Sequence, residues 1–470
     1  MARKRKPLPT FEKVEITDAG AEGKAIARVE NMVVFIPFVV PGDVVDIRVV
    51  KKKKKFYEGK ATAFHKYSPL RSEPRCEHFG LCGGCKWQHM SYESQLKFKQ
   101  KQVADNFTRI GKFEIPPVES IIGSDRQYFY RNKMEFTFSN RKWLVAEEFD
   151  GTQEHDMNGL GFHLPGMFDR IIDLSNCYLQ PEPSNSIRQA VRDFSINNGF
   201  SFYDVRNHRG FMRNLIIRTA STGQVMVIVV VAEDSPEDLK KLLDFLPEKF
   251  PEITSLFHVL NTKRNDIIND LELQLYYGKP FILEAMEGLK FKVGPLSFYQ
   301  TNSHQAEKLY GVVRSFAGLQ GGEVVYDLYC GTGTITNFVA SKAKKVIGIE
   351  YIPSAIDDAR ENSELNSISN TEFFVGDIAK TLSHEFFGAN GRPDVVITDP
   401  PRAGMHPKVV EQIVSAAPAK VVYVSCNPAT QARDIALMEE QYRVDCIQPV
   451  DMFPQTHHVE NVVLLTKKQQ

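Results

Sequence analysis

Short apolar runs alternate with amphipathic stretches from about residue 290 to the end of the chain. Runs of this length, rich in β-branched residues, are typical of buried strands, and strands separated by helices are typical of a parallel sheet. A glycine-rich turn follows the first run and an acid ends the second, as at the start of a doubly wound sheet. The pattern predicts an α/β domain with a Rossmann-like, doubly wound sheet in residues 291–470. The expected strands are 323–329, 345–350, 373–377, 395–399, 421–424 and 461–465.

Two other patterns precede this domain. Five short apolar runs separated by turns predict a small closed β-barrel in residues 1–66. Residues 67–290 mix strands and helices and are expected to form a central α+β domain. Its first helix is expected at 92–110, with its lysines on the solvated face. The expected barrel strands are 14–16, 25–29, 32–40, 44–50 and 59–65.

Composition and charge limit the class of protein and its partners. The 470 residues are 42% hydrophobic and 25% charged, as in a soluble globular protein of two or three domains. The formal net charge is zero, yet residues 1–66 carry 15 Lys+Arg against 8 Asp+Glu, so the barrel is basic. No apolar segment follows the basic residues 3–6, and the longest apolar run, 225–232, is too short to span a membrane. We expect a cytoplasmic protein with no membrane partner.

A run of five lysines interrupts the predicted barrel at residues 51–55, next to Phe56 and Tyr57. Such a run is usually a solvated loop. On a basic barrel with aromatic neighbours, it also fits a surface that binds phosphates and stacks on bases. Residues 130–136 combine aromatic and basic side chains in the same way. Together these segments favour RNA as the partner.

Three of the seven cysteines, Cys76, Cys82 and Cys85, lie within ten residues of each other, around the pair Gly83 and Gly84. An odd number of cysteines with this clustering indicates a metal or catalytic role rather than a disulfide framework. Cys177 is the candidate fourth ligand, because other cysteines fall in the motifs described next. The spacing leaves structural zinc and an iron–sulfur cluster as alternatives.

The turn at residues 330–334 and the acid Glu350 predict a nucleoside site. Thr336 stands where a dinucleotide-binding turn has its third glycine, which favours a ligand without a pyrophosphate, such as S-adenosylmethionine. Glu350, at the tip of its strand, suits two ribose hydroxyls. Asp377, after the next strand, is a candidate for contacts to adenine.

A thiol and a carboxylate stand at two other strand ends. Cys426 follows the strand 421–424, and Pro428 prevents that strand from continuing. Glu460 opens the strand 461–465. A nucleophile and a base placed in this way suggest paired catalytic work, although a structural cysteine and a solvated glutamate are the simpler reading. Near them, two prolines follow Asp399 and stiffen its backbone.

These motifs resemble the RNA 5-methyluridine (uracil-C5) methyltransferase family, in its RumA-like ribosomal RNA branch, over nearly the whole chain. Residues 42–45 resemble the TRAM domain, an OB-like RNA-binding module. The other matching motifs are Phe298-Tyr299-Gln300-Thr301-Asn302, Asp327-Leu328-Tyr329-Cys330-Gly331-Thr332-Gly333, Asp399-Pro400-Pro401-Arg402, Ser425-Cys426-Asn427-Pro428, and Phe453-Pro454 followed by Thr456, His458 and Glu460.

The resemblance implies a function and a role for each site residue. Cys426 would attack C6 of a uracil in RNA, and Glu460 would remove the C5 proton after methyl transfer from S-adenosylmethionine. Gln300, Tyr329, Glu350 and Asp399 would line the methyl-donor site or its border with the uracil. Cys76, Cys82, Cys85 and Cys177 would bind a 4Fe–4S cluster. The expected substrate is large-subunit ribosomal RNA, and the expected state is a monomer.

Three alternatives stay open at this stage. The same chemistry could act on transfer RNA. A cytosine C5 methyltransferase would also use a thiol nucleophile. A non-catalytic RNA-binding assembly factor would keep the barrel and the cysteines but would not need Cys426 or Glu460.

Overall fold

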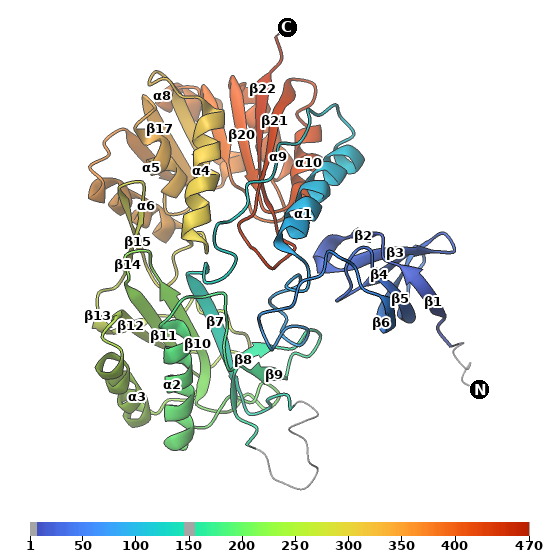
Figure 1. Ribbon diagram of the computed structural model, residues 1–470. Helices are drawn as coiled ribbons and strands as arrows, with labels where there is room; N and C mark the ends of the chain where they lie inside the picture. The colour runs from blue at the N-terminus through green and yellow to red at the C-terminus, as the bar shows by residue number, and fades with distance from the viewer. Residues whose placement is uncertain (1–6, 145–155, 470) are drawn as a thin grey trace, which may run out of the picture.

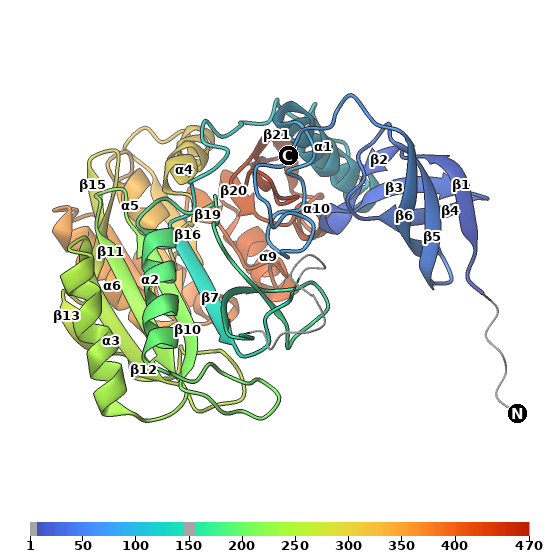
Figure 2. The same ribbon diagram turned by 60° about the horizontal axis from the view of Figure 1, so that its bottom comes forward.

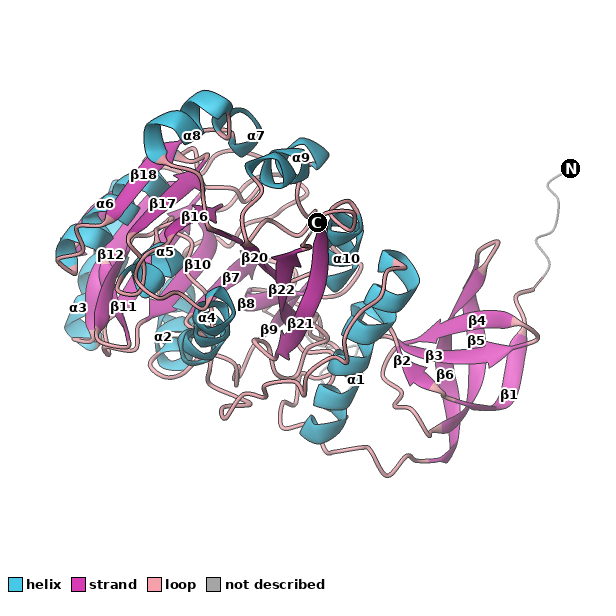
Figure 3. Ribbon diagram, turned by 90° about the horizontal axis from the view of Figure 1, so that it is seen from above, coloured by secondary structure: helices cyan, strands magenta, loops and turns pink. Residues whose placement is uncertain are grey.

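The computed structural model describes residues 7–144 and 156–469, so the basic residues 3–6 lie outside the described ranges. Three large sheets make up the molecule, with the N-terminal barrel set to one side of the other two (Figures 1 and 3). None of the helices in the described ranges has the length and hydrophobicity that a bilayer crossing requires.

The barrel is a six-stranded sheet with the order β1-β5-β6-β4-β3-β2, curled around a core that includes Ile16, Val34 and Ile47. The predicted strands are present, and the additional strand β2 has only two residues. Lys51 and Lys52 belong to β5. The last three lysines of the run lie between β5 and β6. The elements are β1 (Thr10–Glu15), β2 (Asp18–Ala19), η1 (Ala21–Gly23), β3 (Ala25–Val29), β4 (Met32–Ile36), β5 (Val44–Lys52) and β6 (Phe56–Lys66).

Helix α1 (Tyr92–Asn106) connects the barrel to the rest of the molecule and ends in the π-helical turn η2 (Phe107–Gly111). The helical spacing predicts an apolar face of Leu96, Val103, Phe107 and Ile110; Val103 and Phe107 are buried, but Ile110 in η2 is exposed. The expectation that its lysines are solvated is wrong for Lys99, which is fully buried with its Nζ 2.6 Å from Oδ1 of Asp451. A cation can be buried in this way because an acid from a distant part of the chain pairs with it.

The central sheet has seven strands in the order β13-β12-β11-β10-β7-β8-β9, and helices α2 and α3 lie side by side on one of its faces (Figure 2). Strands β10 and β11 are buried along their whole length, as the continuous apolar sequence of β11 predicts, although β10 also contains Arg213, Asn214 and Arg218. The elements are β7 (Lys133–Ser139), β8 (Gly159–His163), β9 (Ile171–Asp173), α2 (Ser184–Asn197), β10 (Met212–Thr219), β11 (Val225–Val231), α3 (Pro236–Lys249), β12 (Ile253–Leu260) and β13 (Gln274–Gly278).

The C-terminal sheet has the order β18-β17-β16-β19-β20-β22-β21. The first five strands are parallel, as predicted, and β22 runs antiparallel to both of its neighbours. Alternate residues of β20 face opposite sides: Val422 and Val424 pack with α4 and α5, whereas Val421 and Tyr423 pack with α9 and α10. The strands are β16 (Val324–Leu328), β17 (Lys345–Glu350), β18 (Thr371–Val375), β19 (Val395–Thr398), β20 (Lys420–Ser425), β21 (Tyr442–Val450) and β22 (Glu460–Lys467). The helices are α4 (Ser303–Ala317), α5 (Thr334–Ala340), α6 (Pro353–Leu365), α7 (Ile378–Thr381), α8 (His384–Asn390), α9 (Pro407–Ala416) and α10 (Pro428–Ala436).

A hairpin of β14 (Ile282–Met286) and β15 (Leu289–Val293) joins the central and C-terminal sheets. One hydrophobic core runs through this junction and includes Ile228 of β11, Leu309 of α4 and Val424 of β20. The two sheets therefore pack against each other as one body, with the site described next between them.

Candidate active site

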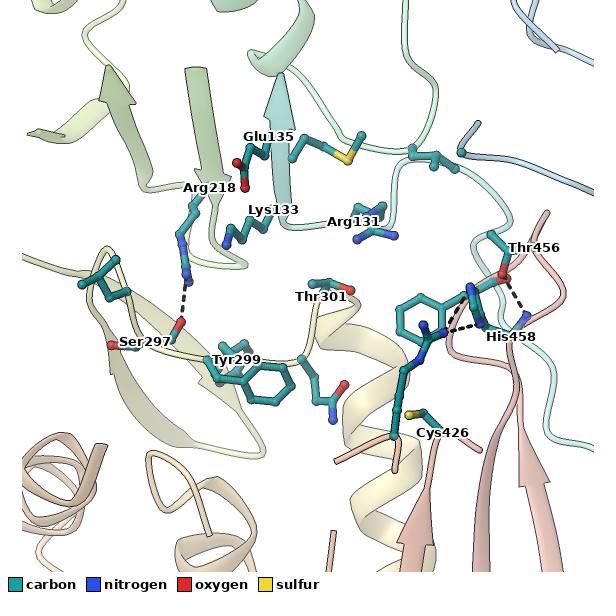
Figure 4. A pocket seen from close by; sticks show the side chains of 18 of the residues that line it. Arg131, Lys133, Glu135, Arg218, Ser297, Tyr299, Thr301, Cys426, Thr456 and His458 are labelled. Carbon is teal, nitrogen blue, oxygen red and sulfur yellow. Dashed lines mark hydrogen bonds between the residues drawn. The ribbon is translucent and has the colours of Figure 1, made fainter. Parts of the chain in front are cut away.

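A cavity of about 1650 Å³ contains almost all of the residues that the sequence analysis singles out. Its walls come from the central domain, the 294–301 segment and the carboxyl ends of the C-terminal strands (Figure 4). The predicted site residues that line it are Cys426, Glu460, Gln300, Tyr329, Glu350, Asp399, Cys76, Cys82, Cys85 and Cys177. Asp377 does not line the cavity. It caps α7, where its Oδ1 accepts a hydrogen bond from the Ala379 N–H at 3.1 Å.

The pairing of β20 with β22 brings Cys426 and Glu460 together. Ser425, the last residue of β20, lies opposite Asn461 in this antiparallel ladder. Cys426, which follows β20, and Glu460, which precedes Asn461, are therefore neighbours at the same edge of the sheet. Asn427 then caps α10 through the Ala429 N–H and donates to the Arg402 carbonyl at 3.1 Å, which fixes the turn. The pairing thus places a thiol beside a carboxylate that lies 34 positions later in the chain.

The environment of Cys426 does not by itself favour the thiolate. Burial and, after it, the charge of Glu460 raise the pKa of this thiol to about 11. The Arg402 side chain acts in the opposite direction, through a hydrogen bond and its charge. Arg402 therefore stabilises the thiolate, which is the reactive form of the cysteine.

Arg402 is held in place by His458. Its Nη2 lies 2.8 Å from the imidazole Nδ1 (Figure 4). Burial, and then the charges around it, lower the pKa of His458 to about 3, so this ring is neutral at pH 7 and accepts the hydrogen bond. In the sequence, Arg402 stands out only as the last residue of the Asp399-Pro400-Pro401-Arg402 motif, and its place after the two prolines is the available signal.

Three carboxyl groups are buried at the strand ends. Burial raises the pKa of Asp399 and of Asp327 to about 7 and raises the pKa of Glu460 well above its usual range. Asp327 accepts a hydrogen bond from Thr336 Oγ1 at 2.6 Å, so it holds the turn that follows β16. Asp399 and Glu460 both line the cavity, so each can exchange a proton with a molecule bound there.

The turn after β16 is built for close approach of a ligand. Tyr329, Gly331 and Gly333 all have positive φ angles, of 64°, 54° and 74°. A Cβ at Gly333 would lie 2.9 Å from the Cβ of Ala359, so only glycine fits there. Glu350 accepts the Gly331 N–H at 3.3 Å and the Tyr351 N–H at 2.8 Å, which joins the tips of β16 and β17.

The segment around Gln300 is fixed from three directions. The Asn302 side chain caps α4 and donates to the Met452 carbonyl at 3.0 Å. The Asn132 amide donates to the Gln300 carbonyl at 2.9 Å. The segment that carries Gln300 is thus tied to the central domain and to the loop before β22, with Gln300 itself in the cavity wall.

The four predicted cysteine ligands line the same cavity, and all four are half-buried. Burial and, to a smaller extent, the other thiols of the set raise the pKa of Cys82 to about 11 and of Cys85 to about 12. The Gly84 N–H donates to the Cys82 sulfur at 3.4 Å. Within residues 7–144 and 156–469, however, no three His, Cys, Asp or Glu side chains are gathered as a metal-binding group. The four thiols fit a metal centre by their composition. Burial disfavours the negatively charged thiolates, and a bound metal cation would offset that negative charge.

Comparison with known proteins agrees with this site. Residues 282–468 match the family model described as tRNA (Uracil-5-)-methyltransferase, and residues 11–62 match the TRAM domain. Proteins named "Uncharacterized RNA methyltransferase" from Bacteroides thetaiotaomicron and Porphyromonas gingivalis are 56% and 54% identical to the chain. These matches cover 95% and 97% of the chain and 99% of each relative.

A solved structure is similar over almost the whole length. It is the Pyrococcus abyssi tRNA (uracil-54, C5)-methyltransferase in complex with S-adenosyl-L-homocysteine, with a TM-score of 0.75 and 28% identity. The match covers 96% of this chain and all of that one. The sequence motifs, the arrangement of the strand ends and these relatives agree. The chain belongs to the RNA uracil-5-methyltransferase family and has a TRAM domain in its N-terminal part.

Proposed function

We propose that the protein transfers a methyl group from S-adenosylmethionine to C5 of a specific uridine in RNA, through a covalent bond between Cys426 and C6 of the uracil. One observation carries this proposal: Cys426, Arg402, Asp399 and Glu460 face the same cavity as the turn that begins at Tyr329. A nucleophile, a cation, a base and a nucleoside-binding turn are thus available to one bound uracil.

The reaction balances with these groups. The Cys426 thiolate adds to C6, and the electrons of the C5–C6 double bond move toward C5 and the O4 carbonyl. The donor supplies an electrophilic methyl group, which C5 takes up. Glu460 then removes the remaining proton from C5, the double bond re-forms, and the C6–sulfur bond breaks.

The charges fit this order of events. Before addition, the thiol and the Glu460 carboxyl each oppose the ionisation of the other. Once sulfur is bonded to C6 it carries no negative charge, so the pKa of Glu460 falls and its carboxylate becomes available as the base. Arg402 favours the ionised form of both groups. Asp399, whose pKa is about 7, is placed to bind the polar edge of the uracil.

We assign the donor site to Gln300, Tyr329 and Glu350, with Asp399 at its border with the uracil. Glu350 is the candidate for the ribose hydroxyls, because it stands at the tip of β17 beside the Gly331 turn. Asp377 follows the adjacent strand β18 and remains the proposed contact for adenine. Asp377 lies outside the cavity lining, so it would contact a ligand only where the ligand extends beyond the cavity.

We further propose that Cys76, Cys82, Cys85 and Cys177 bind a 4Fe–4S cluster. Four half-buried thiols that line the cavity and have no disulfide partner support it, and the family resemblance favours iron over zinc. Such a cluster can carry electrons, but the methylation uses none, so its role here would be to hold residues 76–85 against residue 177. Protein purified without oxygen should contain iron and sulfide, and stoichiometric zinc without iron would refute the assignment.

The division of labour follows the three sheets. We propose an RNA-binding TRAM module in residues 1–66, a cluster and RNA-binding domain in residues 67–290, and a methyltransferase domain in residues 291–470. We propose a monomer that acts on large-subunit ribosomal RNA in the cytoplasm. Transfer RNA is the second candidate, because the similar Pyrococcus abyssi enzyme acts on a transfer RNA uridine according to its description.

One experiment tests the function and the substrate together. RNA from a strain that lacks the gene is separated into ribosomal and transfer RNA, and 5-methyluridine is mapped in each fraction. The proposal predicts the loss of one 5-methyluridine in the large ribosomal RNA, restored by adding back the protein and S-adenosylmethionine. Loss from transfer RNA would select the second candidate. Methylated cytosine as the lost nucleoside, or no lost nucleoside, would refute the proposed reaction.

A further inference from the structure

Two cations stand directly opposite each other at the wall of the cavity. Lys133 of β7 pairs in register with Arg218 of β10. Side chains at paired positions emerge on the same face of a sheet, and like charges placed this way repel each other. Figure 4 shows both side chains, with Arg131 beside them, on the side of the cavity that faces Cys426. Such a repulsive arrangement costs stability and calls for a compensating anion.

No acid in the described part of the chain forms an ion pair with these cations, although the charge of nearby Glu135 acts on Lys133. Arg218 is only 5% exposed, its Nη2 donates to the Ser297 carbonyl at 2.8 Å, and its Nε has no partner. The Nε of Arg131 is likewise buried without a partner. Within residues 7–144 and 156–469, no ion pair involves Arg131, Lys133 or Arg218. Glu135 lines the same wall, yet it forms no ion pair with Lys133.

Two other buried cations are paired with acids. Lys99 pairs with Asp451, and Arg213 donates to three backbone carbonyls and pairs with Asp266 at 3.1 Å. Arg188 is closer to Arg218, because its Nε also has no partner and burial lowers the pKa of each guanidinium to about 10. Arg188, however, donates to two backbone carbonyls and does not line the cavity, whereas Arg218 lines the cavity, where a ligand can supply the missing charge.

We propose that Arg131, Lys133 and Arg218 form a subsite for a phosphate group of the RNA strand next to the uridine that enters the cavity. The inference rests on the proposed function, since it needs an RNA base near Cys426. The three cations are spread from Phe453, over which Arg131 lies, to Ser297 at the other end. An extended nucleic-acid backbone follows such a row and presents one negative charge for each nucleotide.

The carboxylate of the methyl donor is the other possible source of an anion. S-adenosylmethionine also carries an ammonium and a sulfonium group, so its net charge is positive and three cations would repel the molecule as a whole. A phosphodiester has no such opposing charge. The same reasoning makes the subsite a device that holds the strand while the base lies in the cavity, where the cost of unstacking must be offset.

The test uses the full-length protein with the substitutions Lys133→Met and Arg218→Met. Lys344→Met is the control, because Lys344 is exposed and does not line the cavity. Binding of an oligouridylate of about twelve nucleotides is measured by fluorescence anisotropy over a range of salt concentrations. Binding of S-adenosylhomocysteine is measured by calorimetry, and Arg218→Lys tests whether the charge alone restores RNA binding.

Each cavity variant should weaken binding of the oligouridylate roughly tenfold and flatten its log–log salt dependence by about 0.7. Affinity for S-adenosylhomocysteine and the behaviour of Lys344→Met should match the wild type. Unchanged RNA affinity in Lys133→Met, which is half-buried and the safer variant to fold, would overturn the subsite. Loss of S-adenosylhomocysteine binding with intact RNA binding would assign the cations to the donor instead.

Failure of the subsite and failure of the function are separable. Methyl transfer by the wild type into RNA from the deletion strain is measured in parallel. An active wild type with unchanged variants would reject only the phosphate subsite. A wild type that transfers no methyl group to uridine would overturn both proposals.

Discussion

At the scale of single residues, the site depends on how a half-buried thiol becomes reactive. Burial and Glu460 hold the pKa of Cys426 at about 11, and Arg402 opposes them. A cysteine with this pKa is almost entirely protonated at neutral pH. We therefore expect Arg402, which neutral His458 holds in position, to set the reactivity of Cys426 in the ligand-free enzyme.

Replacing Arg402 by Met should slow the alkylation of Cys426. The thiolate is the form that reacts, so the rate rises with pH toward the pKa of the thiol. Without the guanidinium the pKa of Cys426 is higher. The labelling rate at pH 8 then falls about tenfold for each unit by which this pKa rises. Labelling with iodoacetamide, read out on the peptide that contains Cys426, measures the effect across pH.

Arg402→Lys serves as the matched variant for this measurement. A lysine keeps the charge but not the forked geometry, so its labelling rate should fall between those of the wild type and Arg402→Met. Equal rates in all three proteins over the whole pH range would show that Arg402 does not act on the thiol.

At the scale of elements, the loop that leads into β22 is anchored from a distance. Lys99 of α1 donates to Asp451 and to the Phe453 carbonyl, and Tyr92 of the same helix donates to Asp451 at 2.9 Å. These contacts position residues 451–459, which carry His458 to its place beside Arg402. The long-range pair thus joins the first helix to the last strand of the active site.

Lys99→Met should destabilise the protein strongly, because it leaves Asp451 buried without its cation. Breaking a buried pair in this way costs about 3–5 kcal/mol. Lys97→Met on the exposed face of the same helix should change the free energy of unfolding by no more than about 0.5 kcal/mol. Denaturant unfolding of both variants checks this, and equal stabilities would contradict the anchoring role.

The lysine run divides between a strand and a turn, which sharpens its prediction. Lys51 already pairs with Glu58 at 3.3 Å, whereas Lys53, Lys54 and Lys55 are exposed. Replacing the latter three by Gln should weaken RNA binding and flatten its salt dependence, by up to about 0.7 for each lost phosphate contact. Lys51→Gln should have a smaller effect. A salt dependence identical to that of the wild type would make the run a solvated loop.

Local patterns predict the elements well and their partners poorly. Alternation and glycine turns identify the parallel strands and the place of Glu460 at the start of β22. The same patterns assign Lys99 to solvent, because a helical wheel contains no information about an acid more than three hundred residues away. The roles of Arg402 and Arg218 escape sequence reasoning for the same reason, since both depend on the packing of separate strands.

At the scale of the whole molecule, the central and C-terminal sheets combine around one cavity, and the barrel lies outside its lining. The central sheet contributes the cation row, the C-terminal sheet contributes the thiol, the carboxylates and the nucleoside turn, and the cysteines close one wall. The barrel stands to one side and is joined to them through α1 (Figure 3). Each sheet is recognisable from its sequence pattern, but the shared hydrophobic core that fixes their arrangement is visible only in the structure.

The covalent route through Cys426 can be tested directly, with two control reactions. RNA from the deletion strain is the substrate, with S-adenosylmethionine as the donor. RNA containing 5-fluorouridine should trap the wild type, because fluorine cannot leave C5 as a cation. Cys426→Ala should form no adduct with either RNA and should transfer no methyl group.

The decisive measurement is denaturing electrophoresis of Glu460→Gln after incubation with that RNA and the donor. Thiol addition and methyl transfer need no base at C5, but release of the enzyme does, so this variant should accumulate a covalent protein–RNA species that carries the new methyl group. Turnover of Glu460→Gln at the wild-type rate without such a species, or methyl transfer by Cys426→Ala, would contradict the account.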